Sequence, residues 1–194
     1  MSQPFGNEKI LKILQKSIVN NKVAHGYLFC GTDGIGKKLF ALHFAKMLNC
    51  EDSTNIPCEH CKQCTKISKG LHPDIKLIQT ETKFIKIETI KELSIFSQSQ
   101  PFEGKFKVAI IDDAHKMNLA ASNALLKTLE EPSRHTIIIL ITSNPKSLLP
   151  TIASRSVKIS FSPLNDETLT KILIDKGFAI EKIKEILPIS QGSV

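Results

Sequence analysis

The sequence predicts an α/β protein in which helices cover both faces of a parallel sheet. Strand-like and helix-like segments alternate along most of the chain, which is typical of parallel sheets. Residues 136–142, TIIILIT, are almost all β-branched or leucine, as in a strand buried on both faces. The apolar run at residues 27–30 leads directly into a glycine-rich turn and then a helical pattern, an order typical of phosphate-binding α/β folds.

The elements of the first half are predicted from apolar periodicity. Residues 7–19 and 38–48 carry apolar side chains at helical spacing, and residues 27–30 between them form a short apolar strand. After a cysteine-rich stretch, residues 74–78 are predicted as a strand and residues 88–97 as a helix.

The second half continues the alternation. Residues 107–111 form a buried strand that ends in two acids, and residues 118–129 form a helix that stops before Pro132, because proline cannot continue the hydrogen-bond ladder. Strands are predicted at 136–142 and 157–161, and helices at 167–176 and 180–187. The segment SPLND at 162–166 interrupts the alternation of strands and helices. We therefore expect a core at 1–162 and the start of a small helical domain at 163–194.

The composition is that of a soluble globular protein. The chain has 194 residues, of which 41% are hydrophobic and 23% charged. No stretch approaches the roughly 18 apolar residues that span a bilayer, and the N-terminus lacks the order of a secretory signal. We expect a cytoplasmic protein. The net charge of +7 suits an anionic partner such as DNA or a nucleotide, although a solvated lysine-rich face gives the same number.

The glycine-rich turn has the form of a P-loop. The string GTDGIGKK places Gly31, Gly34, Gly36 and Lys37 in the G-x-x-x-x-G-K pattern between a strand and a helix. Backbone N–H groups and the helix N-terminus of such a loop bind phosphate, and the lysine reaches the β- and γ-phosphates. Lys38 departs from the pattern, because a Ser or Thr there would give a hydroxyl to Mg²⁺. A turn without a ligand is the alternative interpretation.

Two acids follow the strand at 107–111. Asp112 occupies the place of a Walker B acid, which holds Mg²⁺ beside a P-loop. Asp113 stands where a glutamate would polarise the attacking water, and its side chain is about 1.5 Å shorter, enough to slow the reaction strongly. The pattern favours a site that binds a nucleotide but hydrolyses it poorly. Alternatively, the acids only favour the start of the following helix.

Four cysteines have the spacing of a metal site. Cys50, Cys58, Cys61 and Cys64 offer the four thiolates of a tetrahedral structural Zn²⁺ within a module at about 50–64. His60 is a rival ligand that the four thiolates make unnecessary, so we treat it as a solvated loop residue. Free thiols or redox chemistry are the alternative.

In this order the motifs resemble bacterial DNA polymerase III clamp-loader subunits of the AAA+ family. The resemblance is carried by the P-loop, the cysteine insertion after its helix, DDAH at 112–115 and SRS at 154–156. The stretch MNLAASNALLKTLEEP at 117–132 is the most specific, and the resemblance covers nearly all of the chain. It implies an AAA+ P-loop NTPase fold with a zinc-binding insertion and the start of a helical lid.

The resemblance also implies roles for two further residues. Arg155 is similar to the arginine of the family's SRC motif, which reaches into the ATP site of a neighbouring subunit as an arginine finger. Ser143 is similar to the residue at the sensor 1 position, which faces the γ-phosphate, although Thr142 and Asn144 leave the register open.

The departures from the P-loop and Walker B patterns, at Lys38 and Asp113, indicate which type of subunit to expect. A motor of gamma/tau type needs its P-loop hydroxyl and its Walker B glutamate, whereas a delta-prime-type subunit can lend its arginine without hydrolysing ATP. This chain lacks the first pair and keeps Arg155. We expect a delta-prime-type subunit that supports ATP-dependent loading of a sliding clamp onto DNA. Its own ATPase activity would be weak or absent. The alternatives are an active gamma/tau-type ATPase and a zinc-dependent DNA-binding protein with a vestigial nucleotide fold.

The resemblance implies partners and cofactors as well. The partners are the gamma/tau and delta subunits, the sliding clamp and, through the complex, primer-template DNA; no membrane is involved. The cofactors are a structural Zn²⁺ and, if the P-loop holds a ligand, ATP with Mg²⁺. Residues 191–194 are similar to the start of the sensor 2 helix, and the C-terminal collar domain is expected to be absent.

Overall fold

Five parallel strands form the sheet at the centre of the computed structural model, which describes all residues except 1–3, 81, 191 and 194. Their order across the sheet is β2-β3-β4-β1-β5. The strands are β1 (Gly26–Cys30), β2 (Ile75–Ile78), β3 (Lys107–Ile111), β4 (Thr136–Thr142) and β5 (Val157–Ser160). Since all strands run the same way, their C-terminal ends share one edge, where ligands of such sheets bind.

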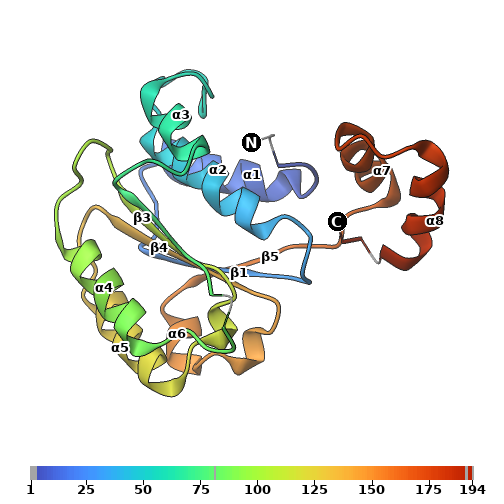
Figure 1. Ribbon diagram of the computed structural model, residues 1–194. Helices are drawn as coiled ribbons and strands as arrows, with labels where there is room; N and C mark the ends of the chain where they lie inside the picture. Colours follow the sequence, from blue (N-terminus) through green and yellow to red (C-terminus); the bar gives the residue numbers. More distant parts are fainter. Residues whose placement is uncertain (1–3, 81, 191, 194) are drawn as a thin grey trace.

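Helices cover both faces of this sheet (Figure 1). One face carries α1 (Glu8–Val19), α2 (Lys37–Asn49) and α3 (Lys62–Ser68), and the other carries α4 (Ile87–Gln98), α5 (Leu119–Glu130) and α6 (Pro150–Ser154). Strand side chains alternate between the two faces. Tyr27 and Phe29 pack in the core beneath α1 and α2, while Leu28 and Cys30 pack against α4 and α5. The predicted parallel sheet with helices on both faces is confirmed.

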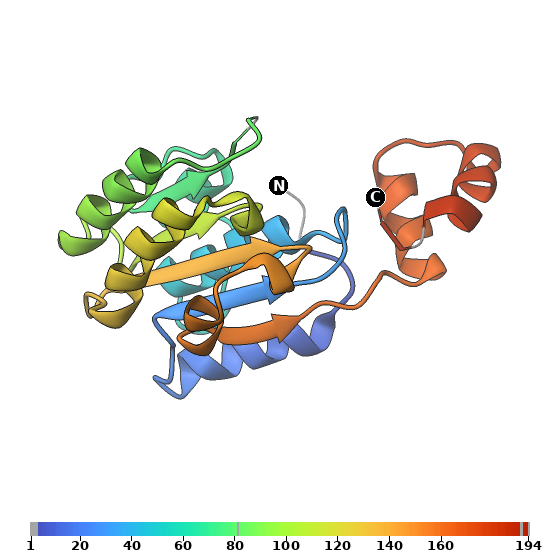
Figure 2. The ribbon, with the colours of Figure 1, turned by 90° about the horizontal axis from the view of Figure 1, so that it is seen from below.

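The last two helices form a separate small unit. α7 (Asp166–Asp175) and α8 (Ile180–Ser190) pack around a core of their own, built from Leu164, Leu169, Leu173 and Ile183. Figure 2 shows this pair beyond the C-terminal end of β5, joined to the sheet by an extended segment. The expected start of a further helix at 191–194 involves Gln191 and Val194, which lie outside the described residues.

The N-terminal segment is attached to the connection between the two units. Asn7 donates from Nδ2 to the carbonyl oxygen of Ser162 over 3.1 Å, and the Ser162 N–H donates to Asn7 Oδ1 over 3.0 Å. Pro4 and Phe5 are therefore held beside the glycine-rich loop, where they and loop residues line a shared cavity.

The predicted elements are present with small shifts at their ends. The strands at 107–111 and 136–142 have the predicted bounds, and the helix expected at 38–48 spans Lys37–Asn49. The short helices α3 and α6 and the 3₁₀ turns η1 (Ala114–Lys116) and η2 (Pro145–Ser147) were not predicted. Within the described part of the chain, no helix is long and apolar enough to cross a membrane.

Candidate functional site

The glycine-rich loop connects β1 to α2, as predicted. A Cβ added to Gly31 would lie 2.6 Å from Ile35 Cδ1 and 2.9 Å from the carbonyl oxygen of Phe161, so no side chain fits there. Gly36 caps α2 with a φ of 87°, a conformation that residues with a Cβ rarely adopt. The tight loop and the direction of α2 therefore depend on glycine at these two positions.

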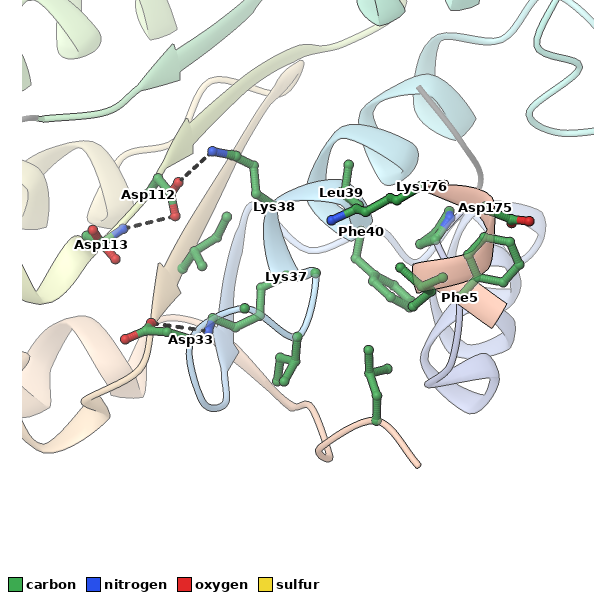
Figure 3. A pocket seen from close by; sticks show the side chains of 17 residues that line it. Phe5, Asp33, Lys37, Lys38, Leu39, Phe40, Asp112, Asp113, Asp175 and Lys176 are labelled. Carbon is green, nitrogen blue, oxygen red and sulfur yellow. Dashed lines mark hydrogen bonds and ion pairs between the residues drawn. The ribbon is translucent and has the colours of Figure 1, made fainter. Parts of the chain in front are cut away.

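A cavity of about 750 Å³ opens beside this loop. On one side it is bounded by Lys37, Lys38, Asp112 and Asp113 (Figure 3). The opposite side is formed by the N-terminal segment, by α7 and by residues that flank α7, as follows: Pro4, Phe5, Leu164, Ile172, Asp175 and Lys176. The volume is that of small-molecule sites, and a charged side facing a partly apolar side suits a ligand with both polar and aromatic parts.

Lys37 is folded back onto its own loop. It is buried, and its Nζ donates to the carbonyl oxygens of Gly31 at 2.7 Å and Thr32 at 2.6 Å. Asp33 Oδ1 lies 3.8 Å from the same nitrogen. Burial lowers the pKa of Lys37, because removal from water disfavours the charged ammonium. A phosphate in the loop would take the place of these carbonyls as the partner of Nζ.

Lys38 and Asp112 form an ion pair. Lys38 Nζ lies 3.3 Å from Asp112 Oδ2 (Figure 3). Gln79 Nε2 donates to the same oxygen over 3.4 Å, and the Asp113 N–H donates to Oδ1 over 3.2 Å. The carboxylate expected to hold Mg²⁺ therefore faces an ammonium of the same chain.

Asp113 is paired in the same way. Its Oδ2 lies 2.8 Å from Lys116 Nζ, and the hydrogen bond to Asp113 raises the pKa of Lys116. Asp113 has a φ of 51°, the left-handed conformation that aspartate adopts more readily than most residues. Sequence analysis missed Lys116, although its i,i+3 spacing from Asp113 was the available signal.

Two hydroxyl side chains lie at the C-terminal end of β4, those of Thr142 and Ser143. Thr142 ends β4 fully buried, with Oγ1 3.3 Å from His115 Nδ1, and it accepts a hydrogen bond from the Asn144 N–H over 3.0 Å. Ser143 is half-buried and is not among the described residues that line the cavity. Its sensor 1 role stays a prediction.

Arg155 lies at the other edge of the sheet. It follows α6 and precedes β5, so it is at the N-terminal edge, whereas the P-loop follows the C-terminal end of β1. A strand of four residues separates these edges by about 13 Å. Arg155 Nη2 lies 2.8 Å from Glu130 Oε1, and Nη1 donates to the Thr151 carbonyl oxygen over 3.1 Å. The structure therefore places Arg155 away from the cavity of its own chain.

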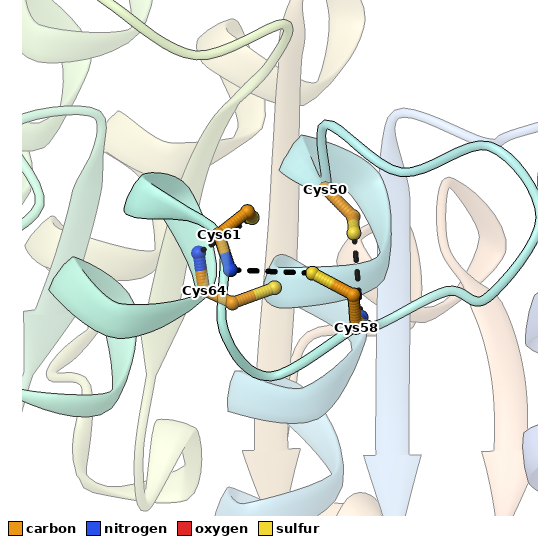
Figure 4. A group of neighbouring side chains, drawn as sticks. All are labelled: Cys50, Cys58, Cys61 and Cys64. Atoms are coloured by element: carbon orange, nitrogen blue, oxygen red, sulfur yellow. Dashed lines mark hydrogen bonds between the residues drawn. The ribbon is translucent and has the colours of Figure 1, made fainter.

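The four predicted cysteines converge between α2 and α3 (Figure 4). Their Sγ atoms all lie within 4.8 Å of one another, and Cys50, Cys58 and Cys64 are buried. The N–H groups of Cys58, Cys61 and Cys64 donate to the sulfurs of the preceding cysteines over 3.4, 3.3 and 3.4 Å. Such N–H···S bonds favour the thiolate form that binds metal.

The net effect differs among the thiols: burial raises the pKa of Cys50 and of Cys64 in spite of their hydrogen bonds, whereas the pKa of Cys61 is lowered. Burial acts to raise its pKa, but hydrogen bonds from the Glu51 and Cys64 N–H groups outweigh burial, and the pKa is about 7. His60 is exposed, and its Nδ1 lies 2.7 Å from the Cys58 carbonyl oxygen. It is not part of the cysteine group, as expected.

A buried polar network, which no sequence pattern predicts, connects this module to the sheet. Gln63 on α3 contacts His72, with Oε1 2.6 Å from Nε2. The Asp74 N–H donates to His72 Nδ1 over 3.1 Å, just before β2. Asn49 Oδ1, at the end of α2, accepts from the N–H groups of Lys105 and Phe106 at 2.8 and 2.9 Å. The end of α2, α3 and the loop before β3 are thus fixed to one another.

Comparisons with known proteins agree with these features. Residues 6–165 match the protein family described as "DNA polymerase III, delta subunit". The chain is 38% identical over 168 residues to DNA polymerase III subunit delta' of Bacillus subtilis, covering 87% of this chain and 51% of that protein. It is 37% identical to the delta' subunit of Pseudomonas aeruginosa, covering 88% and 53%, and 38% identical to subunit tau of Escherichia coli, covering 84% and 26%. The chain spans about half the length of the delta' relatives.

Solved structures with the same arrangement show the fold. A DNA polymerase III gamma subunit-related protein of Thermotoga maritima superposes with a TM-score of 0.61 at 21% identity, covering 99% of this chain and 55% of that one. The RuvB Holliday junction branch migration motor of the same organism gives 0.61 at 16% identity, covering 97% and 58%. These similarities confirm the predicted AAA+ P-loop fold.

Proposed function

Because this chain belongs to the DNA polymerase III delta subunit family, we propose that it acts as a delta-prime-type clamp-loader subunit. In this role it supports ATP-dependent loading of a sliding clamp onto DNA by supplying Arg155 to the ATP site of a neighbouring subunit. The chain's own ATPase activity is weak or absent.

The position of Arg155 carries this proposal. An arginine at the N-terminal edge of the sheet cannot reach the phosphate loop of its own chain, but it is exposed on the surface where a neighbour can dock. A guanidinium presented to a transferring phosphoryl group stabilises the charge that develops there. In the isolated chain, the guanidinium of Arg155 is paired with the carboxylate of Glu130.

The paired acids support a non-motor role. Asp112 faces Lys38, and Asp113 faces Lys116, so neither carboxylate is set to hold a metal ion or orient water. Gly31, Gly34, Gly36 and Lys37 keep the shape of a phosphate-binding loop, and Ser143 is the proposed sensor 1 residue. We assign residues 1–162 to the AAA+ core and 163–194 to the start of the helical lid.

Zinc is proposed as a structural ion. Cys50, Cys58, Cys61 and Cys64 would bind it with all four positions occupied, so it would have no catalytic role. Bound there, it would fix α3 and the preceding loop to the end of α2. This segment has few apolar contacts of its own to keep it folded.

The partners proposed are the gamma/tau and delta subunits and the sliding clamp. Primer-template DNA is reached through the complex, and the net charge of +7 is favourable for that contact. The compartment proposed is the cytoplasm, where replication takes place and thiols stay reduced.

The test is Arg155→Ala in the full-length protein, assembled with its partners into a clamp loader. We expect hydrolysis at the adjoining ATP site to fall by about 10³-fold in single-turnover measurements, while folding is unchanged. Arg134→Ala is the matched control, since Arg134 is exposed in the loop before β4, at the same edge of the sheet. Unchanged hydrolysis in the Arg155 variant would refute the role. Steady ATP turnover by the isolated protein, lost with Lys37→Ala, would instead identify a gamma/tau-type motor.

A further inference from the structure

The pair formed by Lys38 and Asp112 occupies the place where a P-loop protein holds Mg²⁺. Lys38 is in the first turn of α2 and Asp112 directly follows β3, and their side chains meet at 3.3 Å across the charged side of the cavity. In the usual pattern, a hydroxyl and a carboxylate at these two positions bind the cation between them. Here the position of the hydroxyl is occupied by Lys38, which is itself a cation.

The negative charges of both acids, Asp112 and Asp113, are already paired with donors of the same chain. Asp112 has a donor for each oxygen, with Gln79 on Oδ2 and the Asp113 N–H on Oδ1, while Asp113 pairs with Lys116. A divalent ion would have to displace Lys38 from Asp112 without gaining the hydroxyl ligand that it normally receives. The residues present therefore do not fit a resident Mg²⁺.

The groups that bind phosphate itself are intact. The loop keeps its glycines, α2 directs its N-terminus to the cavity, and Lys37 is at its base. Lys38 is 41% exposed, so its ammonium has N–H groups available to a ligand in the cavity in addition to the one facing Asp112. An ammonium has three N–H donors where a hydroxyl has one O–H donor, so Lys38 can contact phosphate oxygens directly.

We propose that this cavity binds a nucleoside triphosphate or diphosphate without a divalent cation, and that Lys38 serves as the built-in counter-ion. Lys37 then leaves the loop carbonyls for the phosphates, and Lys38 bridges the phosphates and Asp112. Binding would fix the loop and the lid without leading to hydrolysis. This goes beyond the proposed function, because the action of Arg155 on a neighbour does not require this cavity to hold a ligand.

The test compares ATP and ADP binding to the full-length protein in EDTA and in Mg²⁺, by calorimetry. For the wild type we expect dissociation constants that agree within about 3-fold between the two buffers. Lys38→Thr restores the usual hydroxyl and removes the ammonium. In EDTA it should bind at least about 10-fold more weakly than the wild type, and Mg²⁺ should restore its binding. Lys9→Thr, on the exposed face of α1, is the control and should leave binding unchanged.

A second variant, Asp112→Asn, changes the affinity for ATP in opposite directions under the two hypotheses. Asp112→Asn removes the negative charge that Lys38 neutralises, so it should strengthen ATP binding in both buffers. If Asp112 instead held Mg²⁺, the variant would weaken binding in Mg²⁺ alone, which would overturn the proposal. The proposal also fails if the wild type requires Mg²⁺, if it binds neither nucleotide, or if Lys38→Thr behaves as the wild type. None of these results bears on Arg155, whose role is measured at the neighbour's site.

Discussion

Arg155 and Glu130 form an ion pair of 2.8 Å that joins the turn before β5 to the last residue of α5. Their side chains are 37% and 48% exposed, and ion pairs in such positions contribute about 0–1 kcal/mol. Little free energy is therefore needed to release Arg155 from Glu130. Docking of a neighbouring subunit can supply that amount.

Removal of Glu130 should leave the arginine functional. We expect Glu130→Gln to change the free energy of unfolding by less than about 1 kcal/mol. ATP hydrolysis in the reconstituted clamp loader should be unchanged or faster, because Arg155 no longer has to leave a carboxylate. Urea denaturation and single-turnover hydrolysis measure the two effects, with Glu131→Gln as the neighbouring control. A loss of hydrolysis as large as that of Arg155→Ala would show that Glu130 itself takes part at the interface.

Much of the fold could be predicted because its strands are buried. Residues 108–111 and 136–142 are continuous apolar or β-branched runs, and the observed bounds of both strands, 107–111 and 136–142, equal the predicted ones. The helix α3 was missed because KQCTKIS has few apolar residues; its start depends on Cys61 Sγ accepting the Cys64 N–H. The order of the strands in the sheet arises from pairing between distant segments, for which local periodicity carries no signal.

The candidate site was predicted less completely. The cysteine group could be foreseen, because the short spacings of Cys58, Cys61 and Cys64 bring three thiols together and Cys50 precedes them by only eight residues. The contact of Lys38 with Asp112 joins residues 74 positions apart and depends on the conformation of a long flexible side chain. The hydrogen bonds of Lys37 to the carbonyl oxygens of its own loop were not predicted either. Such choices between partners are decided by tertiary packing.

The cysteine group should bind one zinc ion per chain, measured by elemental analysis of protein purified without added metal. Cys58→Ser should lose the ion and lower Tm by about 5 °C or more, since one ligand of four is removed. A strong chelator should destabilise the wild type but not the variant. Cys30→Ala is the control, because Cys30 is buried in β1 away from the group. Wild-type protein without zinc would refute the assignment.

Gly31→Ala should distort the phosphate loop. The added Cβ would be 2.9 Å from the Phe161 carbonyl oxygen, which belongs to the backbone and cannot rotate away. We expect a loss of about 1–3 kcal/mol in the free energy of unfolding, as for other overpacked sites. Gly177→Ala is the matched control, since it has a φ of 84° but open space around its Cβ. A Gly31 variant no less stable than this control would show that the loop can relax.

Asp74 should stabilise the fold in a pH-dependent way. Its buried carboxylate accepts the N–H groups of Phe102, Glu103 and Gly104 at 2.7, 2.9 and 2.8 Å. Burial acts to raise its pKa, but these three hydrogen bonds outweigh burial, and the pKa lies below the ordinary 3.8. The stabilisation is therefore fully present above pH 3.8 and is lost as the pH falls through the lower, folded-state value.

Asp74→Asn exposes this contribution, because an amide offers only one acceptor oxygen to three donors. Near neutral pH we expect a loss of about 1–3 kcal/mol in the free energy of unfolding by urea. The difference from the wild type should narrow as the pH is lowered below 3.8, where the wild-type carboxylate also becomes protonated. Asp166→Asn, exposed at the start of α7, should change stability by less than about 0.5 kcal/mol throughout. If the difference stayed constant down to acid pH, the ionised carboxylate would not be what holds the loop before β3, and the connection between the cysteine module and the sheet would depend on Asn49 and Gln63 instead.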